Sequence, residues 1–263
     1  MKYSIAKTFF FSVILAVLGA CSSDNLTPLN DQRIQEPGTV VIHGYNALND
    51  SIQIAVNGKF VKIGTEKNNT AFIKKIEKNY EFVFYENEIK TFVITNKRTS
   101  QILASYRFTT EAPSSSLYFY AKEDLWIDNP SYLKPGTLSQ TGRTGYKFIF
   151  PSMNKYSNSG YTGSLDGIIT KSNNGQVLGI VENINRNTPS TFVEFLYSTP
   201  VAIKMELVKH GTTESYVVGQ KVIVSMSMTN NKSKVIVLDE KQDVNGTFSG
   251  VEGVINLADY FTF

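Results

Sequence analysis

Few side chains in this 263-residue sequence could perform acid–base or nucleophilic chemistry. Hydrolysis by an activated serine needs a base that takes the serine proton near neutral pH, and that base is usually histidine. The chain has two histidines, His43 and His210, and no Gly-x-Ser-x-Gly segment accompanies them, so we interpret both as packed or solvated residues. Two carboxylates across a cleft could instead cleave a glycosidic bond. The acids nearest to aromatic residues or predicted strand ends are Asp124, Asp128, Asp166, Glu182 and Glu194.

One segment approaches the pattern of a calcium-binding loop. With Lys241 taken as position one, Asp243 and Asn245 occupy positions three and five. Gly246 and Glu252 follow at positions six and twelve, and oxygen ligands at this spacing suit Ca²⁺. However, Lys241 places an ammonium group where the loop needs a carboxylate. The alternative is a plain hairpin turn at Asn245-Gly246, and no other cofactor is expected.

Four aromatic residues stand outside the alternating patterns described below, and some of them should be exposed. An exposed ring can stack on the apolar face of a sugar or contact a protein partner. Trp126 has a second interpretation, in which its ring seals the joint between two domains. The candidate ligand-binding residues are therefore Trp126, Tyr132, Tyr156 and Tyr161.

Residues 1–20 predict an exported chain. Lys2 and Lys7 accompany a ten-residue, almost wholly apolar run from Phe9 to Leu18, which is the length of the apolar region of a signal peptide. A membrane-spanning helix needs about 20 apolar residues, so it is the weaker interpretation. Residues 21–37 are mostly polar and predict a flexible tether.

The segment Leu18-Gly19-Ala20-Cys21 resembles the lipobox of bacterial lipoproteins. The resemblance implies cleavage before Cys21, diacylglycerol on its thiol, an N-acyl chain such as palmitate on its amine, and therefore a membrane anchor. Ser22 in the next position implies the outer membrane, and Ser22-Ser23-Asp24 resembles the export signal of surface lipoproteins in the Bacteroidota. The surface and the periplasmic side both stay open. The alternative is an ordinary cleavage site that leaves Cys21 as a free thiol.

Beyond residue 37 the apolar residues alternate with a period of two, which is typical of β-strands. The clearest unit is a hairpin in which Asn57-Gly58 separates two alternating runs, because this pair accepts the positive φ angles of a type I′ turn. Further runs rich in Val, Ile, Phe, Tyr and Thr are predicted as short strands over residues 39–45, 71–76, 80–85, 89–95, 102–108 and 117–121. This spacing predicts antiparallel β-sandwiches, which are immunoglobulin-like or transthyretin-like.

Strand patterning lapses between residues 131 and 145, where Pro135, Gly136, Gly142 and Gly145 lie among Ser and Thr. We place a linker there, after a first sandwich over residues 38–130 and before a second over residues 146–263. The second half has its own strand runs and Asn-rich turns. No sequence repeat links the halves.

The first half resembles an uncharacterised sandwich domain of bacterial envelope proteins, which pairs a V-x-V-x-H strand with a D-x-x-V-N-G hairpin. The resemblance rests on Val40-Val41-Ile42-His43 and on Gln53-Ile54-Ala55-Val56-Asn57-Gly58, although Thr39 and Gln53 replace the first Val and the Asp of the pattern. It implies an immunoglobulin-like or transthyretin-like fold and no catalytic residues. Asp50-Ser51-Ile52 also resembles the O-glycosylation sequon of Bacteroidota envelope proteins, which would place a glycan on Ser51.

Charge and composition restrict the function. The 26 basic and 23 acidic residues give a net charge of +3, which disfavours nucleic acid as a partner. One Cys excludes an internal disulfide. We therefore expect a non-catalytic envelope lipoprotein whose loops bind glycan or protein. The alternatives are a structural or adhesin subunit of an outer-membrane assembly and a hydrolase with a carboxylate pair.

Overall fold

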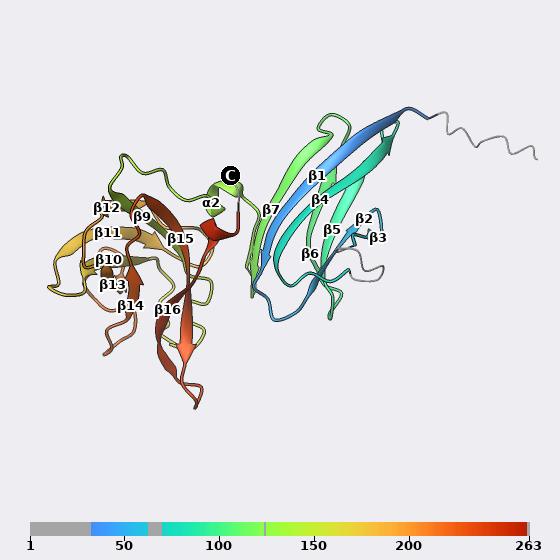
Figure 1. The fold of residues 1–263 in the computed structure, drawn as a ribbon. Helices are drawn as coiled ribbons and strands as arrows, with labels where there is room; N and C mark the ends of the chain where they lie inside the picture. Colours follow the sequence, from blue (N-terminus) through green and yellow to red (C-terminus); the bar gives the residue numbers. More distant parts are fainter. Residues whose placement is uncertain (1–32, 63–69, 124, 262–263) are drawn as a thin grey trace, which may run out of the picture. The chain divides into compact units, whose positions relative to one another are not determined.

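The computed structural model describes residues 33–62, 70–123 and 125–261, and its regular structure is almost entirely β-strand (Figure 1). The strands form four four-stranded sheets, and the sheets belong in pairs that each enclose a core. The all-β, sandwich-type fold predicted from the sequence is confirmed.

Eight strands form the first sandwich. One sheet contains β1 (Gln35–Asn46), β4 (Lys74–Tyr85), β7 (Ser114–Lys122) and β8 (Leu125–Ile127) in the order β4-β1-β7-β8. The other contains β2 (Ile52–Val56), β3 (Lys59–Phe60), β5 (Lys90–Asn96) and β6 (Ile102–Phe108) in the order β3-β2-β5-β6. Alternate side chains from both sheets, such as Ile42, Ile54 and Phe119, are fully buried in one core.

The second sandwich also has eight strands. β9 (Arg143–Ile149), β12 (Val193–Leu196), β15 (Lys232–Gln242) and β16 (Phe248–Asn256) form a sheet in the order β12-β9-β15-β16. β10 (Leu165–Lys171), β11 (Val177–Ile184), β13 (Ala202–Lys209) and β14 (Ile223–Ser227) form the other in the order β11-β10-β13-β14. Phe148, Leu165 and Met205 are among the buried residues between them.

The two sandwiches have the same topology. Adding eight to every strand number of the first pair of sheets gives the strand order of the second pair. Both also contain one parallel pair, β1 with β7 and β9 with β15, beside antiparallel neighbours. The two parallel pairs are an addition to the predicted antiparallel pattern. No local turn joins such strands, so the sequence carries no signal for them. The structure thus repeats a unit that the sequence does not visibly repeat.

Local predictions agree with the structure at the hairpin and differ at two other strands. Asn57 and Gly58 have φ angles of 45° and 80° between β2 and β3, as the predicted turn requires. The two strands predicted over residues 71–85 are instead one strand, β4, because the polar pair Lys78-Asn79 continues an edge strand rather than turning it. The three-residue strand β8 was not predicted, and Trp126 lies within it.

Helical structure is short in the described residues: α2 (Pro130–Leu133) and a single 3₁₀ turn, Leu257–Asp259. No helix in the part of the chain that the structure describes is both long and apolar enough to cross a membrane. A third cluster of buried residues includes Tyr120 from β7, Leu133 from α2 and Val237 from β15. The domain boundaries proposed from the sequence stay a prediction.

Candidate functional site

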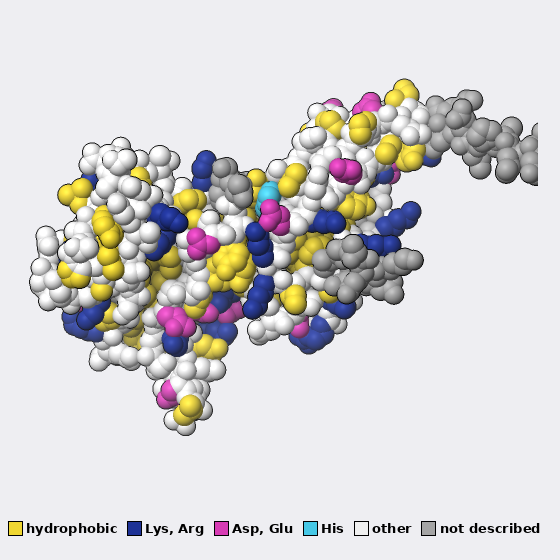
Figure 2. Space-filling view, in the orientation of Figure 1, with side chains coloured by type: hydrophobic (Ala, Val, Ile, Leu, Met, Phe, Trp, Pro, Cys, Tyr) yellow, Lys and Arg dark blue, Asp and Glu magenta, His cyan; other side chains and the backbone are white. Residues whose placement is uncertain are grey.

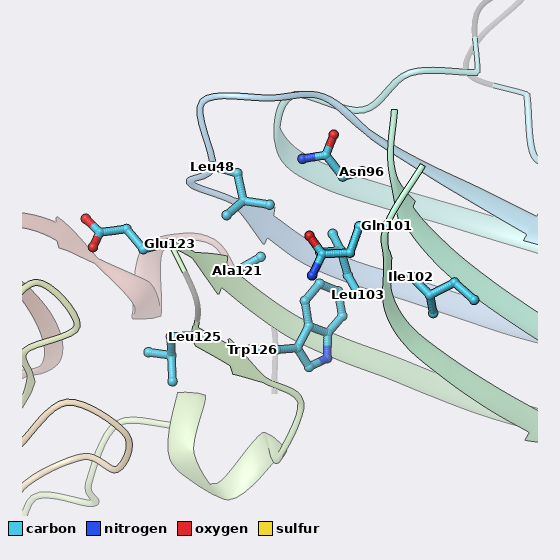
Figure 3. A pocket seen from close by; sticks show the side chains of 9 residues that line it. All are labelled: Leu48, Asn96, Gln101, Ile102, Leu103, Ala121, Glu123, Leu125 and Trp126. Carbon is cyan, nitrogen blue, oxygen red and sulfur yellow. The ribbon is translucent and has the colours of Figure 1, made fainter. Parts of the chain in front are cut away.

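A pocket of about 400 Å³ lies at one end of the first sandwich, around Trp126 (Figure 3). This volume is within the range of about 300–1,000 Å³ that is typical of small-molecule sites. Figure 3 shows that the lining side chains come from the β1–β2 connection, from the β5–β6 turn and from the ends of β7 and β8. They are Leu48, Asn96, Gln101, Ile102, Leu103, Ala121, Glu123, Leu125 and Trp126.

The indole of Trp126 is fixed on two sides. Its ring stacks on Phe119 with centroids 4.6 Å apart and an interplanar angle of 14°, and Trp126 pairs with Ala121 across the β7–β8 ladder. Its Nε1–H donates to the Tyr106 hydroxyl oxygen at 2.9 Å. Trp126 is therefore a half-buried strand residue at the pocket wall, which corrects our placement of it outside strand alternation.

The Tyr106 hydroxyl also forms a hydrogen bond with the carboxylate of Asp128. The hydroxyl donates to Asp128 Oδ2 at 2.9 Å, so Trp126, Tyr106 and Asp128 form a chain of hydrogen bonds. Burial raises the pKa of Tyr106, and the hydrogen bond to Asp128 raises it further against the opposing effect of Trp126. The tyrosine therefore stays protonated and can donate to Asp128.

The polar side chains of the pocket differ in how many hydrogen bonds or ion pairs they already form. Asn96 is buried and fully engaged: its Oδ1 accepts the N–H groups of Arg98 (2.9 Å) and Thr99 (3.1 Å), and its Nδ2 donates to Asp50 (3.0 Å). Glu123 pairs with Lys155 at 2.8 Å. Gln101 is exposed on the rim. Its amide is the group best placed to hydrogen-bond a ligand.

The corresponding end of the second sandwich differs in its connections. There the β9–β10, β13–β14 and β15–β16 connections are longer than their counterparts in the first sandwich, at residues 150–164, 210–222 and 243–247. Glu240 at the end of β15 is 3% exposed and accepts the N–H groups of Asn154 (3.0 Å), Tyr156 (2.5 Å) and Ser157 (3.0 Å). It also accepts the hydroxyl groups of Ser157 (2.6 Å) and Tyr216. These contacts draw the connections together.

The other aromatic candidates lie apart from the pocket lining. Tyr156 is half-buried on the connection held by Glu240, with Lys155 Nζ 5.1 Å from its ring centre. Tyr161 packs against the core of the second sandwich and donates its hydroxyl to the Ser164 carbonyl oxygen at 3.0 Å. Tyr132 on α2 is 36% exposed. Of the four, only Trp126 lines the pocket.

The residues of the calcium pattern have the contacts of a hairpin. Asp243 Oδ1 accepts the N–H groups of Asn245 (2.8 Å) and Thr247 (3.0 Å) within the turn. Glu252 pairs with Lys241 at 2.8 Å, which is the residue that breaks the pattern. Within the described residues, no group of three or more His, Cys, Asp or Glu side chains could hold a metal ion. The arrangement favours the hairpin alternative.

The histidines have different surroundings. His43 stacks on Tyr118 with ring centres 5.0 Å apart. His210 Nδ1 lies 2.8 Å from Asp166 Oδ1, and the Gly211 N–H donates to Oδ2 at 2.9 Å. Among the described carboxylate candidates, Asp128 accepts from Tyr106, Asp166 contacts His210, and Glu194 pairs with Arg143 at 3.1 Å. The charge of Glu182 also raises the pKa of His210. Asp124 lies outside the described residues.

Two modification candidates remain predictions. Cys21, with the rest of residues 1–32, lies outside the described residues. Ser51 lies just before β2, and its carbonyl oxygen accepts the Lys97 N–H at 2.8 Å. Hydrogen bonds from Arg98 and Asn96 lower the pKa of the neighbouring Asp50 to about 2.

Sequence reasoning found Trp126 and Asp128 but missed Tyr106, Leu48 and Gln101 as their neighbours. Tyr106 fitted a strand pattern, in which it has no distinguishing mark. The register pairs Tyr106 with Phe92, but the residues that Tyr106 contacts across the sandwich are set by long-range packing.

The comparisons with known proteins give distant likenesses. No protein-family model matches the sequence, and no curated protein is significantly similar to it. Among solved structures, it is similar to a family 41 carbohydrate-binding module of streptococcal virulence factors, described for α-glucan recognition, with 13% identity, a TM-score of 0.27 and coverage of 85% of this chain and 100% of that one. It is also similar to a family 26 module of Eubacterium rectale Amy13K in complex with maltoheptaose, with 9% identity, a TM-score of 0.21 and coverage of 82% and 94%. These scores are too low for the likeness to bear on what this chain binds.

Proposed function

We propose that this protein is a non-catalytic binding protein of the cell envelope and that its first sandwich binds a glycan in the Trp126 pocket. One observation carries the proposal: an indole fixed by stacking and a hydrogen bond lines a pocket of about 400 Å³ that has a free amide on its rim. A rigid aromatic side chain can contact the apolar face of a sugar ring, and an amide can hydrogen-bond its hydroxyl groups.

The lining favours a neutral glycan. Among the described residues that line the pocket, Glu123 is the only ionisable one, and Lys155 pairs with it. The described lining contains no lysine or arginine to attract a carboxylate or sulfate group. On the face shown in Figure 2, basic and acidic side chains are scattered among one another. A ligand would therefore be selected by shape and hydrogen bonding rather than by charge.

The anchor is part of the same proposal. Lipidation of Cys21 would hold the sandwiches at a membrane surface through the segment that precedes β1. One acyl chain gives only marginal attachment, whereas two or more give a stable anchor. A stable anchor would keep the pocket close to envelope or captured polysaccharide.

A glycan array tests the binding step. The chain from Ser22 onward, which lacks the lipid, should bind neutral oligosaccharides such as maltoheptaose or cellohexaose more strongly than acidic ones.

Trp126→Ala should lower affinity at least tenfold because it removes the contact surface. Gln101→Ala should lower it several-fold without loss of stability, since the Gln101 side chain is exposed. Tyr132→Ala is the matched control, because Tyr132 is exposed but does not line the pocket. Absence of binding to any glycan would refute the proposal.

A second candidate function, as a structural subunit of an outer-membrane assembly, has one observation in its favour. The edge strand β11 exposes Val177 and Ile180 at 59% and 53%. Exposed aliphatic side chains on an edge strand are suited to a partner strand or sheet. Co-purification of a stoichiometric partner from solubilised membranes, lost in Ile180→Lys, would favour this function over glycan binding.

A further inference from the structure

The hydrogen bonds around Trp126 have only one possible direction. An indole Nε1–H can only donate, and an ionised carboxylate can only accept. Tyr106 lies between them at 2.9 Å from each, so it must accept from Trp126 and donate its single proton to Asp128. The carboxylate therefore sets the orientation in which the Tyr106 hydroxyl receives the indole.

We propose that Tyr106 and Asp128 are positioning residues that hold the Trp126 indole ready for a ligand, an inference that rests on the proposed glycan-binding function. The contact joins the two sheets, because Tyr106 is in β6 and Trp126 is in β8. Phe119 fixes the plane of the indole by stacking, and the Tyr106 oxygen fixes its rotation within that plane.

Asp128 shows that more than core packing is involved. Its side chain is exposed, so water could satisfy it without Tyr106. The partly buried Tyr106 hydroxyl could likewise pair with Trp126 alone. The added carboxylate does not bury apolar surface. Its effect is to align the hydroxyl dipole toward the indole, and charge-assisted hydrogen bonds of this kind are stronger than neutral ones.

The functional consequence is a smaller entropic cost of binding. A side chain that is already fixed loses less conformational freedom when a ligand contacts it, and this loss accounts for about a two- to tenfold change in affinity per side chain. Removal of the Tyr106 hydroxyl group should therefore weaken binding while leaving the pocket lining intact, since Tyr106 does not line the pocket.

Trp126 is the only tryptophan of the chain, and this makes the test direct. A ¹H–¹⁵N correlation spectrum of the full chain from Ser22 onward should contain one indole Nε1–H cross-peak. In Tyr106→Phe, this peak should shift upfield and its proton should exchange with water at least tenfold faster. In Asp128→Asn it should shift in the same direction by less. Tyr132→Phe is the matched control and should leave the peak unchanged. The backbone amide peaks report whether each variant remains folded.

The second measurement is the affinity for maltoheptaose and cellohexaose, which should fall between about two- and tenfold in Tyr106→Phe. An unchanged indole peak in Tyr106→Phe would overturn the inference, and so would a shifted peak with unchanged affinity. Failure of the unmodified protein to bind any oligosaccharide would overturn the proposed function instead. In that case the indole peak would still decide whether Tyr106 and Asp128 hold Trp126.

Discussion

At the scale of single residues, His210 and Asp166 form a contact whose contribution to stability depends on pH. The Asp166 hydrogen bond and charge raise the pKa of His210 above its ordinary value of 6.5. Burial would raise the pKa of Asp166, but hydrogen bonds from Gly211, His210 and Asn183 together lower it below 3.8. His210 therefore contributes fully below pH 6.5 and loses its contribution as the pH rises through its folded-state pKa. Asp166 contributes fully above pH 3.8 and loses its contribution as the pH falls through its own.

We therefore predict that His210→Ala destabilises the protein most between pH 3.8 and 6.5 and least above the folded-state pKa of His210. The measurement is the urea midpoint of both proteins across this range. In an Asp166→Asn background, the effect of His210→Ala should depend much less on pH, because the largest contribution to the raised pKa is gone and only the charge of Glu182 remains. A constant difference between the proteins from pH 5 to 8 would contradict the prediction.

At the scale of elements, Glu240 holds the β9–β10 connection. Its carboxylate accepts five hydrogen bonds in a buried position. Glu240→Gln replaces one oxygen by an NH₂ group, which faces N–H donors and leaves them without an acceptor. Each such donor costs about 1–3 kcal/mol, so we expect a loss of about 2–4 kcal/mol in the free energy of unfolding, measured by urea denaturation.

Glu252→Gln is the matched control, because it makes the same chemical change on the adjacent strand. Glu252 is 48% exposed and pairs with Lys241. An exposed ion pair of this kind contributes about 0–1 kcal/mol, so the control should differ little from the unmodified protein. Equal effects of the two substitutions would show that Glu240 does not hold the connection.

The close approach of β1 to β7 couples the core to the pocket. Gly44 is opposite Phe119 in the parallel ladder, and a Cβ at Gly44 would lie 2.3–2.8 Å from three atoms of the Phe119 ring. Gly44→Ala should displace that ring, cost about 1–3 kcal/mol and change the fluorescence of Trp126, which stacks on it.

Gly58→Ala provides the comparison. Its φ angle is 80° and nothing lies within 4 Å of the added Cβ, so the cost of about 1–2 kcal/mol comes from the backbone conformation alone. The Trp126 emission of the folded protein should therefore not change. If both variants change the emission, the coupling between Gly44 and the pocket is wrong.

The strands also show how much of the fold could be predicted from the sequence. Alternation and turn chemistry are local, so the Asn57-Gly58 hairpin and most strands of the first sandwich could be predicted. The parallel pairing of β1 with β7 depends on residues about 75 positions apart, and no turn residue marks it. Strand β8 is only three residues long, too short for alternation to show.

The site was less predictable than the fold for the same reason. The residue type of Trp126 made it a candidate, but the ring of Phe119 and the hydroxyl of Tyr106 that fix it come from other strands. Tyr161 was an equally good candidate by residue type, but its hydroxyl donates to the Ser164 carbonyl oxygen in the second sandwich. Residue type identified the candidates, and tertiary contacts separated them.

At the scale of the whole molecule, the two sandwiches use one topology in two ways. Short connections border the Trp126 pocket at the end of the first, whereas longer connections held by Glu240 lie at the same end of the second. In sandwich proteins, binding depends on the loops that a constant scaffold carries. Loop length therefore distinguishes the two sandwiches at the end where the candidate site lies.

The anchor determines where that site would act, and Cys21 tests it. When the full-length chain is expressed in a bacterium with lipoprotein-processing enzymes, we expect its mature amino-terminal peptide to begin at Cys21 and to carry diacylglycerol and an N-acyl chain by mass spectrometry. In detergent phase separation the protein should enter the detergent phase, because two or more acyl chains bind membranes stably.

Cys21→Ser should move the protein to the aqueous phase without changing its glycan affinity, since the pocket lies in the first sandwich. An unmodified thiol at Cys21 in the mature protein would contradict the anchor and leave the binding proposal to be judged on Trp126 alone.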